Sequence, residues 1–157
     1  MRIGETLSID ITTDLNLQNR AIRLRAEITK AKVARTVFFS VKMCELLKKW
    51  IKFKDRYIEF SLLFPVQLRD KPLFVNNFEK NYKKYCNRVG IEECSPHGLR
   101  NNFAKRFLMS GGDIYTLSKI LGHSSVTVTE EAYLDLLTED LRIKYQNYSP
   151  LLNLKRA

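Results

Sequence analysis

The residues best suited to chemistry lie between Ser95 and Tyr133, in a stretch that holds both histidines of the chain, His97 and His123. Arg100 follows His97 by three residues, so the two side chains would leave the same side of one helix. A helix N-terminus favours an anion, and an arginine can bind a phosphate through two parallel hydrogen bonds. The pair therefore indicates a site for an anionic substrate. A capped helix with an ordinary surface histidine and arginine is the open alternative.

Tyr133 lies ten residues after His123 and is a candidate nucleophile, although one tyrosine among seven is not evidence by itself. A phenol has an ordinary pKa near 10, so only about one in a thousand is ionised at neutral pH. Nearby cations would favour the phenolate and stabilise the charge that develops on a phosphoryl group. The departing alkoxide needs a proton, which a lysine such as Lys30 could deliver. No cluster of Asp, Glu, His or Cys in the sequence suggests a metal.

The composition favours a polyanionic partner. The chain has 157 residues, which suits one domain with a real core, and its net charge is +10. Such an excess attracts nucleic acid or a membrane surface, but no apolar run is long enough to span a bilayer and no signal peptide is recognisable. The alternative is a merely solubilising surface. Cys44, Cys86 and Cys94 are odd in number and lack metal-ligand spacing, so we expect reduced thiols in a cytoplasmic protein.

The elements that must position these residues begin with the end of an amphipathic helix in MRIGETLSI. Alternating apolar residues from Ile22 to Ile28, and again at Val37 and Phe39, predict a hairpin. Its tip is basic and carries the lysines 30 and 32. Helices are expected over residues 40–54, 76–89, 95–110 and 113–121, followed by further helical stretches around residue 133 and from residue 138. Ser40 and Asp113 would be N-caps, and Gly122 would end the last of the four ranges. The first helix would bury Val41, Leu46, Leu47 and Trp50.

The third of those helices is expected to start at Ser95 and Pro96, its N-cap and first position. Leu99, Phe103 and Phe107 would form its buried stripe.

These residues resemble the tyrosine recombinase (phage integrase) family. PHGLR is similar to the family's H-x-x-R box, and LGHSS followed by a tyrosine is similar to its third and fourth boxes. MRIGETLSI is similar to the first box, and AIRLRAEITKAKVARTVFFS resembles the family's hairpin. The resemblance covers residues 2 to about 136, with the motifs in the family's order.

The resemblance implies an α+β, mostly helical fold: a tyrosine-recombinase catalytic core with a small antiparallel β-hairpin sheet. Residues 1–157 would form an integrase catalytic domain that is N-terminally truncated and lacks the preceding helices and core-site-binding domain. We expect such a fragment to be weakly active or inactive alone, and to bind DNA weakly and in a salt-sensitive way. The family acts without cofactor or metal, on double-stranded DNA attachment sites and as a homo-tetramer.

The resemblance also assigns roles to four cationic positions. Arg2 would be the first catalytic arginine, and His97 and Arg100 the first histidine and the second arginine. His123 would bind a non-bridging phosphate oxygen.

Tyr133 would form a 3′-phosphotyrosyl link to DNA, and Lys30 would act as the general acid, with Lys32 as the less favoured lysine. The chain departs from the family pattern at Asn101, where a histidine is frequent, and at Phe38, where a proline is common.

The sequence also supports two further interpretations, one of the function and one of the C-terminal tail. The Gly111-Gly112 turn between two helices resembles a helix-turn-helix, so a non-catalytic basic DNA-binding regulator is the alternative function. The apolar residues of the tail, Leu151, Leu152 and Leu154, suit packing either on a neighbouring subunit or back on their own domain.

Overall fold

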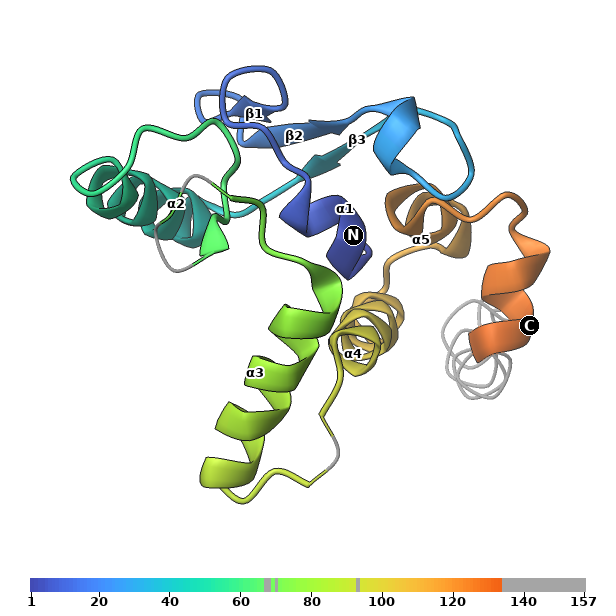
Figure 1. Ribbon diagram of the computed structural model, residues 1–157. Helices are drawn as coiled ribbons and strands as arrows, with labels where there is room; N and C mark the ends of the chain where they lie inside the picture. The colour runs from blue at the N-terminus through green and yellow to red at the C-terminus, as the bar shows by residue number, and fades with distance from the viewer. Residues whose placement is uncertain (67–68, 70, 93, 134–157) are drawn as a thin grey trace, which may run out of the picture. The chain divides into compact units, whose positions relative to one another are not determined.

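The computed structural model describes residues 1–66, 69, 71–92 and 94–133. The predicted helix from Thr138 and the apolar tail lie outside these residues. The chain divides into two compact units, Met1–Arg100 and Asn101–Ala157. The division falls inside helix α4 (Pro96–Met109), so this one helix supplies residues to both units (Figure 1).

The first unit is built on a small antiparallel sheet. Among its described residues, three strands pair in the order β1 (Leu15–Asn16), β2 (Ala21–Leu24) and β3 (Arg35–Phe38). The predicted hairpin is confirmed as β2 and β3. The predicted first strand was too long, because the chain turns into a 3₁₀ helix, η1 (Ala26–Ile28), after Leu24. Strand β1 was not predicted, since its segment is polar.

The register of the hairpin decides which side chains are buried. Ile22 pairs with Val37 and both are buried, whereas Arg23 pairs with Thr36 and both are exposed. The alternation expected of a half-buried sheet is therefore confirmed. The inward residues Ile22, Leu24 and Val37 join a core cluster that also contains Ile9, before the sheet, and Leu47 and Leu63, after it.

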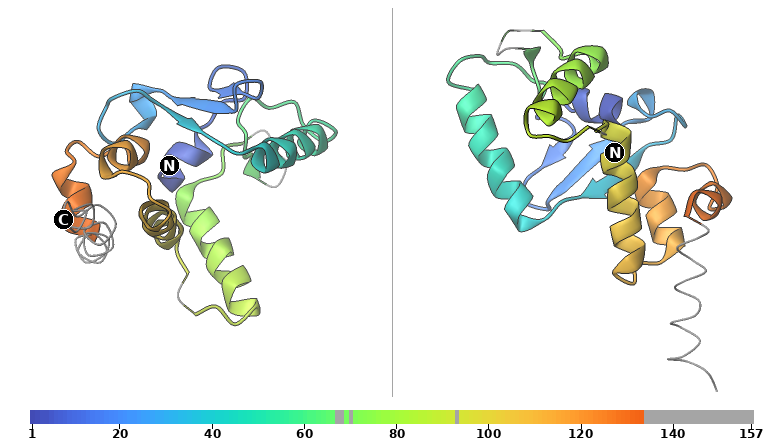
Figure 2. Two further views of the ribbon diagram at one scale, coloured as in Figure 1. Left: turned by 180° about the vertical axis from the view of Figure 1, so that it is seen from behind. Right: turned by 90° about the horizontal axis from the view of Figure 1, so that it is seen from below.

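Three helices complete this unit: α1 (Ile3–Leu7), α2 (Val41–Lys54) and α3 (Val75–Arg88). Helix α1 contacts α3, and the views of Figure 2 show the two side by side. Ser40 caps α2 as predicted, since its Oγ accepts a hydrogen bond from the Met43 N–H at 3.2 Å. Of the apolar residues expected to be buried in α2, Leu47 is, whereas Val41 and Leu46 are more than half exposed.

The second unit contains the rest of α4, α5 (Ile114–Leu121) and a helical segment at residues 127–133. Both predicted caps of α5 are confirmed. The Asp113 carboxylate accepts a hydrogen bond from the Thr116 N–H at 2.8 Å, and Gly122 ends the helix in the left-handed conformation (φ 69°). The core of this unit consists of Ala104, Leu108, Leu117, Leu121 and Tyr133.

The predicted buried stripe of α4 was wrong at two of its three positions. Leu99 and Phe103 are about half exposed, whereas Phe107 packs partly buried against the core. The buried positions of α4 are Arg100, Ala104 and Leu108, four residues apart.

Candidate active site

Arg2 and Glu5 form the first part of the site, at the start of α1. Arg2 is the N-cap residue, and its backbone N–H donates to Glu5 Oε2 at 2.7 Å. The Arg2 guanidinium approaches the same carboxylate at 3.4 Å. Glu5 is only 2% exposed, so its charge needs compensation within the protein.

Arg35, at the start of β3, supplies that compensation. Its two terminal nitrogens donate to the two Glu5 oxygens, Nη1 to Oε1 at 3.1 Å and Nη2 to Oε2 at 2.6 Å. This is the bidentate geometry that makes arginine–carboxylate pairs strong and directional. Burial by itself would raise the pKa of Glu5, but the hydrogen bond from Arg35 and the nearby Arg2 lower it below its usual value.

Arg100 belongs to the same electrostatic neighbourhood. It is 9% exposed and lies on the first turns of α4. The pKa of the Met1 amino group is lowered, first by burial and then by the charge of Arg100, with Arg35 and Arg2 adding smaller effects in the same direction. The three arginines and the opposing Glu5 carboxylate thus all act on the Met1 amino group, and three positive charges exceed one negative charge. Such an arrangement attracts an anion.

His97 and Lys30 belong to the first unit, and both are exposed. The Ser95 hydroxyl accepts a hydrogen bond from the Gly98 N–H at 2.9 Å, so the predicted N-cap that presents His97 is confirmed. Lys30 lies at the tip of the hairpin. Lys32, two residues later, has a left-handed backbone (φ 54°), and its Nζ donates to the Glu27 carbonyl at 3.4 Å.

His123 and Tyr133 belong to the second unit. The His123 ring lies just after the left-handed Gly122, and its Nδ1 is 2.7 Å from the Thr129 hydroxyl, which is fully buried. Thr129 precedes Tyr133 by one helical turn. The Tyr133 hydroxyl donates to the Asn101 side-chain oxygen at 3.3 Å, and the tyrosine is 6% exposed.

The structure therefore brings four of the six predicted residues together in two pairs, and His97 and Lys30 belong to neither. Arg2 and Arg100 form one pair in the first unit, where both charges act on the Met1 amino group. His123 and Tyr133 are linked in the second through one helical turn and Thr129.

Sequence reasoning missed Glu5, Arg35 and Thr129 as functional partners, and it treated Asn101 only as a departure from the family pattern. A signal for Arg35 existed: it lies two residues before the buried Val37, hence on the inward face of a strand.

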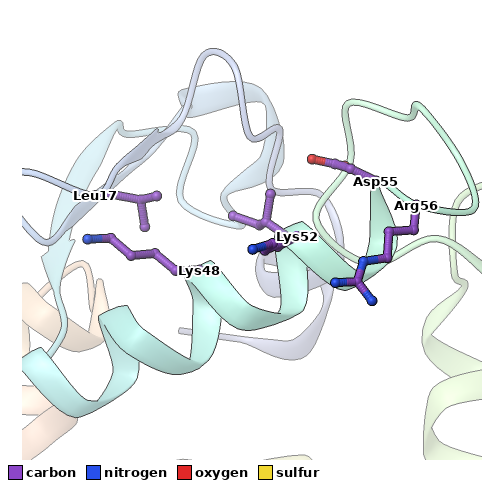
Figure 3. Close-up of a pocket in the computed structure, with 6 residues that line it drawn as sticks. Leu17, Lys48, Lys52, Asp55 and Arg56 are labelled. Carbon is purple, nitrogen blue, oxygen red and sulfur yellow. The ribbon is translucent and has the colours of Figure 1, made fainter.

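No described group of three or more His, Cys, Asp or Glu side chains could hold a metal ion. No helix within the described ranges is long and apolar enough to cross a membrane. A separate hollow of about 500 Å³ lies along α2 and is lined by Leu17, Lys48, Ile51, Lys52, Asp55 and Arg56 (Figure 3). None of the residues discussed above lines it, so it is not part of the site.

Comparison with known proteins identifies the family. Residues 1–140 match the model of the phage integrase family. The chain belongs to the phage integrase family. It is 35% identical over 148 residues to tyrosine recombinase XerA of Saccharolobus solfataricus, an alignment that covers 92% of the chain and 45% of that relative.

Two further comparisons agree with this family assignment. Tyrosine recombinase XerC of Thermodesulfovibrio yellowstonii is 29% identical over 140 residues, covering 83% of the chain and 44% of the relative. The crystal structure of XerA recombinase superposes with a TM-score of 0.77 at 28% identity, over 95% of the chain and 53% of that protein. The predicted fold class is thereby confirmed. The chain spans about half the length of the curated relatives it matches.

Proposed function

We propose that this chain is the catalytic domain of a site-specific DNA recombinase that cleaves and rejoins DNA through a 3′-phosphotyrosyl intermediate. The observation that carries the proposal is the arginine cluster around the buried Glu5, found in a chain of the phage integrase family. A cluster with excess positive charge is what a phosphodiester in its transition state requires.

In the proposed reaction, the Tyr133 phenol gives its proton to water and its oxygen attacks the scissile phosphorus. A tyrosine–phosphorus bond forms, and the bond from phosphorus to the 5′-oxygen breaks. Lys30 donates a proton to that leaving oxygen. The bond energy stays in the phosphotyrosyl ester, so the reverse attack by a 5′-hydroxyl reseals DNA without a cofactor.

The cationic residues hold the phosphate during this exchange. Arg2 and Arg100, with His97, would bind its non-bridging oxygens from the first unit, and His123 would donate to one of them from the second. Arg35 keeps Glu5 neutralised, which leaves most of the Arg2 donors for the phosphate.

The partners follow from the relatives. The natural substrates would be double-stranded attachment sites, recombined in the cytoplasm by a homo-tetramer during integration or excision of a mobile element. In support of this, one structural neighbour is the XerH site-specific recombinase bound to its palindromic difH substrate after cleavage, and another is the Tn1549 transposon integrase in complex with transposon right end DNA. The alternative of a non-catalytic helix-turn-helix regulator is not favoured, because the relatives are named as recombinases.

A covalent-capture experiment tests the proposal without knowledge of the target sequence. The protein, in excess and at low salt, is mixed with duplexes that carry randomised arms around one 5′-bridging phosphorothiolate. The 5′-thiol released by cleavage reseals poorly, so the protein–DNA adduct accumulates. We expect an adduct that survives detergent, maps to Tyr133 by mass spectrometry and disappears in Tyr133→Phe. An adduct that persists in Tyr133→Phe would exclude this nucleophile.

A further inference from the structure

The tip of the hairpin contains a buried hydroxyl. Thr29 is 2% exposed, although its neighbour Lys30 and the following residues 31–34 are exposed. The Thr29 hydroxyl lies 3.0 Å from the carbonyl oxygens of both Ala26 and Val33, and it accepts a hydrogen bond from the Val33 N–H at 3.1 Å. A hydroxyl has one proton, so it donates to one of these carbonyls at a time or shares the proton between them.

These bonds close a loop over residues 29–33. The Val33 backbone binds the Thr29 side chain through both its N–H and its carbonyl, and the Lys32 N–H donates to the Thr29 carbonyl at 3.2 Å. The left-handed backbone of Lys32 is held inside this loop. Lys30 directly follows Thr29, so the hydrogen bonds that hold Thr29 also set the position of the Lys30 backbone.

We propose that Thr29 is a positioning residue for Lys30, and that its hydroxyl holds the loop in the shape that presents the lysine to the 5′-leaving oxygen. This inference rests on the proposed function, in which Lys30 is the general acid. A lysine side chain is long and flexible, and proton transfer needs the donor within hydrogen-bond reach of the leaving oxygen. Fixing the backbone at residue 29 reduces the positions that the ammonium group samples.

The chemistry of the leaving group separates positioning of an acid from general support of the fold. A 5′-alkoxide needs a proton to leave, whereas a 5′-thiolate leaves unprotonated because thiols are far more acidic than alcohols. In the sulfur substrate the tyrosine–phosphorus bond forms, the phosphorus–sulfur bond breaks, and the phenol proton goes to water. Loss of the acid should therefore slow only the oxygen substrate.

The experiment measures single-turnover cleavage of two DNA substrates that share one sequence, recovered by the covalent capture. They differ only in the bridging atom at the cleaved phosphate, which is oxygen in one and sulfur in the other. Thr29→Val replaces the hydroxyl with a methyl of similar size, Thr29→Ser keeps the hydroxyl, and Lys30→Ala is the reference for loss of the acid. Thr36→Val, at an exposed position of β3, is the matched control for the substitution itself.

We expect Thr29→Val to slow the oxygen substrate by about 10- to 100-fold, part of the 10²- to 10⁴-fold typical of general acid catalysis, and to leave the sulfur substrate within about twofold of wild type. Thr29→Ser should restore the oxygen reaction. Equal slowing of both substrates, or of neither, would overturn the proposal. If the wild-type protein forms no adduct with either substrate, the proposed function fails first, and the role of Lys30 with it.

A second measurement tests the hydrogen bonds of the Thr29 hydroxyl independently of catalysis. Trypsin cleaves after Lys30, and cleavage in a loop tracks how often that loop opens. We expect Thr29→Val to raise the rate of this cut by about tenfold, because the buried bonds of the hydroxyl are lost, while Thr29→Ser and Thr36→Val leave it unchanged. An unchanged rate in Thr29→Val would show that the hydroxyl does not hold the loop.

Discussion

Arg35 Nη2 lies 2.6 Å from Glu5 Oε2, whereas the side chain of Arg2, the neighbour of Glu5 in sequence, comes no closer to that carboxylate than 3.4 Å. The residue thirty positions away is therefore the stronger partner. The pairing ties α1 to the start of β3, and so to the hairpin that carries Lys30. It also leaves the Arg2 side chain, which is 33% exposed, open to a ligand.

Glu5 and Arg35 should be strongly coupled in stability. We expect Glu5→Gln to lower the free energy of unfolding by about 3–5 kcal/mol, because it leaves a buried guanidinium without its counter-charge. The double variant Glu5→Gln/Arg35→Gln should lose less than the sum of the single variants, with a coupling energy of about 0.5–3 kcal/mol. Urea unfolding measures this. The control combines Glu5→Gln with Arg23→Gln, on the exposed face of β2. We expect the two changes in the free energy of unfolding to add.

The same carboxylate should make the protein sensitive to acid. The pKa of Glu5 is lower in the folded chain than its ordinary value of 4.5, so its ionised form stabilises the fold above that pH, and the stabilisation is lost as pH falls through the folded pKa. The stability gap between wild type and Glu5→Gln should therefore shrink below about pH 4.5. Unfolding curves at neutral and acid pH test this, with the exposed Glu45→Gln as control. A gap that stays constant would contradict the assignment.

Thr129 should set the tautomer of His123. If the Thr129 hydroxyl donates to Nδ1, the proton of the neutral ring lies on Nε2, and that nitrogen can donate to a phosphate oxygen as proposed. Long-range nitrogen–proton NMR spectra should show the Nε2–H form in the wild type and a mixture in Thr129→Val. The variant should also lose about 1 kcal/mol of stability with the hydrogen bond. A predominant Nδ1–H form would contradict the proposed role of His123.

Asn101 should control the pH dependence of cleavage. Its side-chain oxygen accepts a hydrogen bond from the Tyr133 hydroxyl at 3.3 Å. In Asn101→Asp a negative charge replaces that amide and disfavours the phenolate, so the pH of half-maximal cleavage rate should rise. Asn102→Asp adds the same charge at the neighbouring, exposed position and should leave the profile nearly unchanged. Equal shifts in both variants would indicate a general charge effect.

The local parts of this fold were predictable, and the pairings across it were not. Ser40, Asp113 and Gly122 cap helices as expected, because a cap depends on the few residues around it. The buried face of α4 was mispredicted because burial depends on what packs against a helix, which Leu99 and Phe103 do not reveal.

In the candidate site, too, local motifs were predictable from the sequence and contacts between distant residues were not. The family's motifs singled out Arg2, His97, Arg100, His123 and Tyr133 as candidates from the sequence. The partners that hold some of them in place were not identified, because the contacts join distant positions. The Glu5–Arg35 pair spans thirty residues, and the Asn101–Tyr133 pair spans thirty-two.

Tyr133 is part of the core of its unit as well as the proposed nucleophile. Its ring packs in the core, whereas only its oxygen atom would take part in the proposed reaction, so the two roles can be separated. A gene copy released from the need to cut DNA would still be constrained to keep a large aromatic residue at position 133. Phenylalanine at position 133 would mark a descendant that has lost recombinase activity and kept its fold.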